Sequence, residues 1–149
     1  GYFDLIQSVY EFVLFDDVQY TRRDWRNRNR IKTAHGLAWL TIPVQTTGQY
    51  LSLIKDIEVS DDTWAGKHWK TIVASYARAT QFQWFAERFE PLYTSCPERR
   101  LSLINRRWLE AACDALGIRT RLTWAMDYTV AEGMADAAQK VVALAKEAR

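Results

Sequence analysis

The stretch 98–124 constrains the fold of this chain most strongly, because a helical pattern in it passes directly into a strand pattern. Apolar residues recur at helical spacing from Leu101 to Leu116, and Gly117 just beyond them is a natural helix stop. Apolar and polar residues then alternate from Ile118 to Trp124, which is typical of a half-buried strand. A helix that feeds straight into a strand predicts a crossover unit with parallel strands, which is almost always right-handed.

The rest of the chain continues this mixture of helices and strands. We expect helices over 2–10, 61–79, 81–93 and 131–146, strands over 11–15 and 54–59, and a hairpin near residues 28–44. Ser95 and Glu98 predict a capping box at the start of the helix that ends before Gly117. The order predicts one mixed α/β domain over 1–149, with a Rossmann-like sheet flanked by helices, this hairpin and a helical middle. Because the chain opens directly in a helical pattern, a strand before Tyr2 would complete a second crossover unit.

Composition and charge exclude several classes of protein. The 149 residues are 48% hydrophobic and 26% charged, which is ordinary for a folded chain and excludes disorder. The formal net charge is only +2, so binding to nucleic acid is not expected. There is no apolar run of about 18 residues, so no membrane span is expected. Cys96 and Cys113 form no metal or disulfide pattern, which favours free thiols in a reducing, cytoplasmic compartment.

A polar and basic segment over 16–32 carries most of the chemistry. It follows the predicted strand over 11–15, and ligands of open α/β sheets bind beyond the carboxyl ends of strands. It holds five Arg and only one Lys, and guanidinium groups bind phosphate or carboxylate bidentately. The predicted substrate-binding residues in it are Gln19, Tyr20, Arg22, Trp25, Asn27, Arg28, Asn29 and Arg30.

Asp16 and Asp17 begin this segment and are candidate catalytic carboxylates. They could also bind Mg²⁺, which commonly takes one or two carboxylates together with substrate phosphates. With the Arg forks beside them, they predict recognition of an anionic, nucleotide-linked small molecule, with Mg²⁺ and a nucleotide as the expected cofactors. The alternative is that these acids and bases pair with each other on a solvated hairpin. The preference for Arg, and the interleaved Tyr20 and Trp25, argue against that alternative.

A second candidate group lies on the predicted helix over 61–79. His68 is a candidate general acid or base, and Lys67 is a candidate phosphate ligand. The structural alternative is a partly buried histidine bonded to a carbonyl group, beside a surface lysine.

The sequence resembles the WbqC-like family of bacterial proteins along nearly its whole length. The resemblance rests on GYFDLI at 1–6, FVLFDDVQY at 12–20, WRNRNRI at 25–31, WLTIPV at 39–44, Trp64 with Lys67-His68, Tyr76, and LGI at 116–118. This family usually opens with a strand and a turn before the GYF, and it continues past the last helix. The resemblance therefore implies a chain truncated at both ends.

The resemblance also implies a role in gene clusters for O-antigen and other surface polysaccharides. The expected activity is acyl or aminoacyl transfer, such as glycyl transfer, to the amino group of a nucleotide-linked amino sugar. Arg22, Arg28 and Arg30 would then bind phosphates, and Gln19, Asn27 and Asn29 would bind sugar or base edges. The alternative is a non-catalytic binding or scaffolding module that docks partners on the Arg-rich segment.

Overall fold

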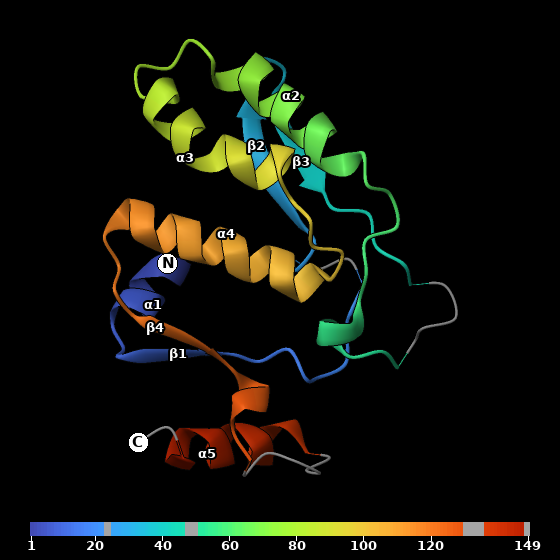
Figure 1. The fold of residues 1–149 in the computed structure, drawn as a ribbon, viewed down its shortest axis with the longest axis vertical. Coiled ribbons are helices and arrows are strands. Elements are labelled where there is room, and N and C mark those ends of the chain that lie inside the picture. The colour runs from blue at the N-terminus through green and yellow to red at the C-terminus, as the bar shows by residue number, and fades with distance from the viewer. Residues whose placement is uncertain (23–24, 47–50, 130–135, 148–149) are drawn as a thin grey trace.

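A pair of parallel strands, β1 (Glu11–Leu14) and β4 (Arg121–Trp124), lies between helices in the computed structural model (Figure 1). The structure describes residues 1–22, 25–46, 51–129 and 136–147. The strands are in register from the pair Glu11–Arg121 to the pair Leu14–Trp124. Their carboxyl ends therefore lie side by side, just before Asp16 in one segment and Ala125 in the other.

Helices cover both faces of this pair (Figure 1). On one face lie α1 (Tyr2–Gln7) and α4 (Leu101–Leu116), which bury Ile6 and Cys113 against Phe12. On the other face lies α5 (Ala137–Glu147), whose Leu144 packs against Val13. Successive residues of β1 thus face opposite layers, as expected for a strand that is covered on both sides. The mixed α/β fold predicted from the sequence is confirmed.

The middle of the chain forms a helical layer packed on a hairpin. The hairpin strands are β2 (Arg28–Thr33) and β3 (Gly36–Thr41), and Gly36 has the positive φ (109°) that its turn requires. Helices α2 (Trp64–Tyr76) and α3 (Phe82–Thr94) follow. The core between them contains Trp64, Ile72 and Tyr93, and Ile31 and Leu40 from the hairpin pack against it.

The expected strand over 54–59 is wrong. Residues 54–56 form a short 3-10 helix, η1 (Ile54–Asp56), and beyond it only isolated bridges join Glu58 to Arg100 and Val59 to Val44. The physical reason is the spacing of the buried residues: Ile54 and Ile57 are both buried in one cluster, which is a helical and not an alternating pattern.

Two other details differ from expectation. Helix α4 begins at Leu101 with no side-chain cap, so the predicted Ser95–Glu98 capping box is absent. The Glu98 carboxylate binds the Arg107 guanidinium instead, at 2.9 Å. The helix expected over 131–146 is α5, and residues 131–135 of that prediction lie outside the described residues. No helix in the described part of the chain has the length and apolar character needed to cross a bilayer.

Candidate functional site

Asp16 is a buried acid just beyond the carboxyl end of β1. Its residue is only 4% exposed, and neither carboxylate oxygen has a hydrogen-bond partner among the described residues. The backbone fixes its position, because the Lys55 N–H donates to the Asp16 carbonyl oxygen at 2.9 Å. An ionised carboxylate buried in this way is costly unless a cation or a hydrogen-bond donor reaches it.

Burial raises the pKa of Asp16 to about 6, and the neighbouring Asp17 charge acts in the same direction. A carboxylate with such a pKa is ionised at neutral pH and still holds a proton well enough to act as a general base.

Asp17 lies beside Asp16 but has a cationic partner. Its Oδ2 atom accepts from the Lys140 ammonium at 2.7 Å, and both side chains are 14% exposed. The Asp17 Oδ1 atom is buried and, within the described chain, has no hydrogen-bond partner. Lys140 comes from α5, so this ion pair joins the last helix to the end of β1.

Three carboxylate oxygens of Asp16 and Asp17 are therefore buried without a hydrogen-bond partner among the described residues. They are oxygen ligands of the kind that Mg²⁺ uses, but two carboxylates would leave most of its six positions to water or substrate. No group of three or more metal-ligating side chains occurs among the described residues. Carboxylate oxygens also accept hydrogen bonds from ammonium groups, so a substrate ammonium group is an alternative to Mg²⁺ as their partner.

The segment after the two acids is held by its backbone. The Tyr20 N–H donates to the Ser52 carbonyl at 2.9 Å, and Gln19 forms a bridge with Leu53. Tyr20 is buried, and this burial raises the pKa of its hydroxyl group. Arg22 donates to the Thr46 carbonyl at 2.5 Å. Tyr20 thus lies in the core and not on an open surface.

The two predicted asparagines hold the hairpin in place. The Asn27 amide donates to the Ile42 carbonyl at 2.9 Å, while the Ile42 N–H donates back to the Asn27 carbonyl at 2.7 Å. The Asn29 side-chain oxygen accepts from the Arg30 N–H at 2.8 Å. These are the strand-end and turn bonds that asparagine commonly makes.

Arg28 and Arg30 stack on tryptophans on the outer face of the hairpin. The Arg28 guanidinium lies 4.5 Å from the centre of the Trp39 ring. The Arg30 guanidinium lies 5.3 Å from Trp25 and 5.4 Å from Trp39. The two indole rings are themselves 5.3 Å apart. The structure therefore brings three predicted residues together around Trp39.

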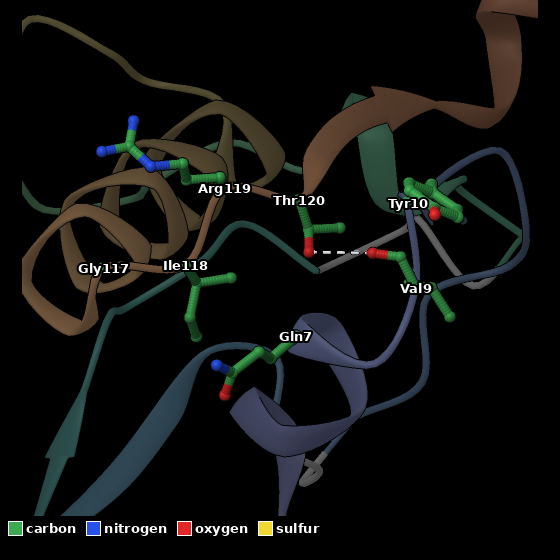
Figure 2. Close-up of a pocket in the computed structure, with 7 residues that line it drawn as sticks. All are labelled: Gln7, Val9, Tyr10, Gly117, Ile118, Arg119 and Thr120. Atoms are coloured by element: carbon green, nitrogen blue, oxygen red, sulfur yellow. Dashed lines mark hydrogen bonds between the residues drawn. The ribbon is translucent and has the colours of Figure 1, made fainter.

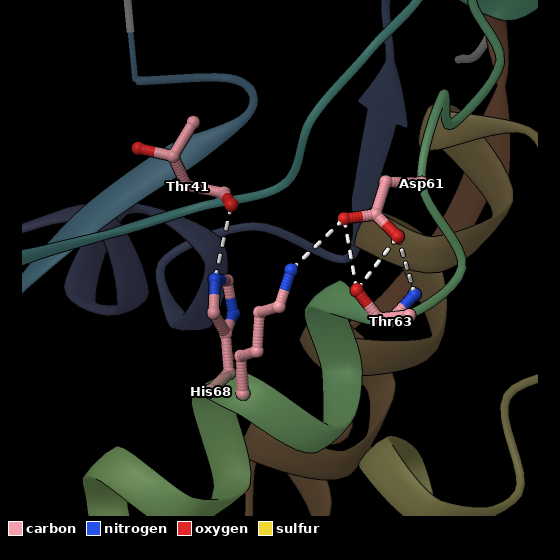
Figure 3. A network of polar contacts seen from close by, with 5 residues as sticks. Thr41, Asp61, Thr63 and His68 are labelled. Atoms are coloured by element: carbon pink, nitrogen blue, oxygen red, sulfur yellow. Dashed lines mark hydrogen bonds and ion pairs between the residues drawn. The ribbon is translucent and has the colours of Figure 1, made fainter.

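His68 lies elsewhere, on α2 (Figure 3). Its Nε2 atom is 3.0 Å from the Thr41 carbonyl oxygen, so this nitrogen carries the proton and donates it. The ring also packs edge-on against Trp64 and Tyr93. Burial lowers the pKa of His68, which keeps the ring neutral at pH 7. In this arrangement His68 joins α2 to the hairpin, as the structural alternative expects.

Lys67, the other predicted residue on α2, is at the surface. Its ammonium group pairs with Asp61 at 3.1 Å, and the side chain is 69% exposed. Asp61 also accepts from the Thr63 hydroxyl and backbone N–H just before α2 begins. These bonds place Lys67 in the local network that starts this helix.

Two cavities lie at the opposite end of the parallel strands. One, of about 270 Å³, is lined by residues that immediately precede β1 and β4, among them Tyr10 and Thr120 (Figure 2). The Thr120 hydroxyl donates to the Val9 carbonyl across it at 3.0 Å. A second hollow, of about 550 Å³, follows α4 from Arg106 to Asp114. Among the described residues, those predicted from the sequence line neither cavity.

Sequence reasoning missed three residues near the candidate site. Lys140 belongs to an Ala-rich helix, and nothing local marks it as a partner of Asp17. Trp39 shows only as one member of an alternating strand, although its register opposite Arg30 is a pairing that a hairpin alignment could have suggested. Arg106 stacks over Trp124 at 5.0 Å, next to the end of β1, and only the fold reveals this contact.

Comparison with known proteins gives a family but no activity. The chain is 47% identical over 133 residues to the uncharacterized protein Rv1507c of Mycobacterium tuberculosis. That match covers 89% of this chain and 58% of the relative, so the chain spans less than two thirds of the relative's length. No solved structure matches. Residues 1–149 match the sequence model of the WbqC-like protein family, and the chain belongs to this family.

Proposed function

We propose that the protein takes part in the synthesis of bacterial surface-polysaccharide precursors, such as those of O-antigen. It would transfer an acyl or aminoacyl group, glycyl among them, to the amino group of a nucleotide-linked amino sugar. The observation that carries this proposal is the Asp16 carboxylate, which is buried beyond the carboxyl end of a parallel strand and has no hydrogen-bond partner in the described part of the chain. Such a group needs a cation, and the ammonium form of an amino sugar supplies one.

Asp16 would act as the general base. An amino sugar arrives largely as an ammonium ion, which cannot attack a carbonyl group. Asp16 takes one proton from this ion, and the free nitrogen then attacks the carbonyl carbon of an activated acyl donor. The carbon–nitrogen bond forms as the bond to the leaving group breaks, and the leaving group departs with a second proton from the nitrogen.

Asp17 and Lys140 would support this step. The Lys140 ammonium neutralises one oxygen of Asp17, which limits the negative charge beside Asp16. Without the Lys140 ammonium, the full negative charge of Asp17 would raise the pKa of Asp16 further and keep Asp16 protonated at neutral pH. If Mg²⁺ were bound instead, Asp16 and Asp17 would hold it, and it would supply positive charge for a substrate phosphate.

A second candidate function is non-catalytic docking through the hairpin. Arg30, Trp25 and Trp39 are exposed and line neither of the two cavities, which favours a binding surface over an enclosed active site. This reading requires no role for Asp16.

The test compares binding and transfer in the wild type and in Asp16→Asn. We expect UDP-, GDP- or dTDP-linked amino sugars to bind more tightly than their N-acylated forms, which carry no ammonium group. Asp16→Asn should remove this preference and lower the rate of amide formation at least about 100-fold, as loss of a general base does. The control is Asp61→Asn, which removes a surface carboxylate.

The outcomes separate the alternatives. Equal binding of amine and amide forms by the wild type would contradict the ammonium site. Binding of Mg²⁺ that is lost in Asp16→Asn, with no preference for the amine, would make the pair a metal site. Full transfer activity in Asp16→Asn would end the case for Asp16 as the base.

A further inference from the structure

We propose that the outer face of the β2–β3 hairpin binds a nucleoside diphosphate, the group to which the sugar of a nucleotide sugar is attached. We call this surface the Arg–Trp face, and it consists of Trp25, Arg28, Arg30, Lys32, Leu37 and Trp39. The inference deepens the proposed function, since it names the part of the substrate that this face would hold. Its evidence is independent of Asp16.

Strand register gathers these side chains on one surface. Arg30 pairs with Trp39, and Lys32 pairs with Leu37, so their side chains share a face. The intervening residues Ile31 and Leu40 point the other way and pack on the core. The Arg–Trp face is therefore the one that the core does not use.

Stacking presents the guanidinium edges outward. The Arg30 guanidinium lies next to both the Trp25 and the Trp39 ring, at 5.3 and 5.4 Å from their centres. A guanidinium that is held by its flat face keeps its N–H groups at the edge, where they can bind two phosphate oxygens at once. No carboxylate among the described residues forms an ion pair with Arg30 or Lys32. Within the part of the chain that the structure describes, no ion pair therefore neutralises the charges of these two residues.

The tryptophans leave much of their surface open. Trp25 is 60% exposed and Trp39 is 47% exposed. An exposed indole beside a cation suits a nucleobase, because every base has a flat aromatic face that can stack on the ring. Base and diphosphate would thus find an aromatic ring and a guanidinium fork in adjacent positions.

The size of the face favours a small ligand. Arg28, Arg30 and Lys32 are alternate residues of one strand, so neighbouring members are about 7 Å apart. The row is short, and the whole chain carries a net charge of only +2. A long polyanion gains affinity from many such contacts, and this chain offers few.

The experiment measures binding of UDP, ADP, uridine and pyrophosphate by calorimetry. We expect both nucleoside diphosphates to bind at least tenfold more tightly than uridine or pyrophosphate, because each fragment uses only half of the face. Arg30→Gln and Trp25→Ala should each weaken UDP binding at least tenfold.

The chain offers a matched control. Arg88 stacks on Trp84 at 4.3 Å on the surface of α3, and no second tryptophan among the described residues stacks with it. Arg88→Gln should leave UDP binding unchanged. A loss as large as that of Arg30→Gln would show that the effect is one of general charge and would overturn the proposal.

Other outcomes are equally decisive. One such outcome is that single-stranded RNA or an acidic polysaccharide binds more tightly than UDP and loses this binding in Arg30→Gln. That result would overturn the proposal, because the ligand of the Arg–Trp face would then be a polymer. Asp16→Asn should bind UDP normally. If UDP fails to bind while transfer still depends on Asp16, the nucleotide site is wrong and the proposed function stands.

Discussion

At the scale of single residues, Asp16 links stability to the proposed chemistry. Its pKa in the folded chain, about 6, lies above the ordinary value of 3.8, so the fold favours the protonated acid. This stabilising contribution is complete below pH 3.8 and is lost as the pH rises through about 6. At neutral pH the ionised carboxylate therefore lowers the free energy of unfolding.

Asp16→Asn should therefore stabilise the protein at pH 7, by up to about 3 kcal/mol from a shift of roughly two pKa units. The advantage should shrink toward pH 4, where the wild-type carboxyl is protonated. Urea unfolding of both proteins at the two pH values measures this. Asp61→Asn should have the opposite sign at pH 7, since hydrogen bonds from Thr63 lower the pKa of Asp61 to about 2. A destabilised Asp16→Asn protein at pH 7 would contradict the burial argument.

His68 should behave as a residue that joins two elements. Its pKa, measured by NMR, should lie below 6.5, because burial disfavours the charged ring. His68→Gln keeps a hydrogen-bond donor but loses the ring contacts with Trp64 and Tyr93, so unfolding should become easier by about 1 kcal/mol. Loss of transfer activity with unchanged stability would instead support the catalytic role predicted from the sequence.

At the scale of elements, two glycines allow a direct comparison. Gly117 ends α4 in the left-handed region, with φ of 70° and ψ of 21°. A Cβ at either Gly117 or Gly66, which lies within α2, would meet no atom within 4 Å. Only the backbone conformation therefore separates the two positions.

Gly117→Ala should destabilise the protein by about 1 kcal/mol, because alanine is strained at positive φ. Gly66→Ala should stabilise it by a similar amount, since alanine is the better helix former. Thermal unfolding of both variants provides the measurement. Equal shifts of one sign would show that these conformations are not those of the folded protein.

Local patterns predicted most of the elements. The stop at Gly117, the alternation in β4 and the hairpin strands all follow from residues next to one another in the sequence. The 3-10 helix at Ile54 was missed because the apolar residues of the short segment 54–59, at positions 54, 57 and 59, fit either period. The Asp17–Lys140 pair could not be predicted, since the two residues are 123 positions apart and only the packing of α5 brings them together.

At the scale of the whole molecule, Glu11 ties distant parts of the chain together. Its carboxylate accepts from Arg121 at 2.5 Å, from the Thr123 hydroxyl at 2.7 Å, and from the Tyr128 hydroxyl. These bonds, that from Tyr128 above all, lower the pKa of Glu11 below its ordinary value of 4.5. The network joins β1, β4 and the segment that follows β4.

Glu11→Gln should lower stability at neutral pH and weaken its dependence on acid. The contribution of the ionised group is present above pH 4.5 and is lost as the pH falls through the lower pKa of the folded state. Wild type should therefore lose more stability between pH 5 and pH 3 than Glu11→Gln does, in chemical unfolding followed by circular dichroism. Parallel curves for the two proteins would contradict this role.

The pairing of β1 with β4 also determines when the fold can form. Glu11 and Arg121 meet across 110 positions, whereas the hairpin closes over a two-residue turn. During synthesis the hairpin and its helices can therefore assemble early, while β1 must wait until β4 has left the ribosome. Until then the apolar side chains of β1 remain uncovered, and nascent chains stalled before residue 121 should be the ones that chaperones bind.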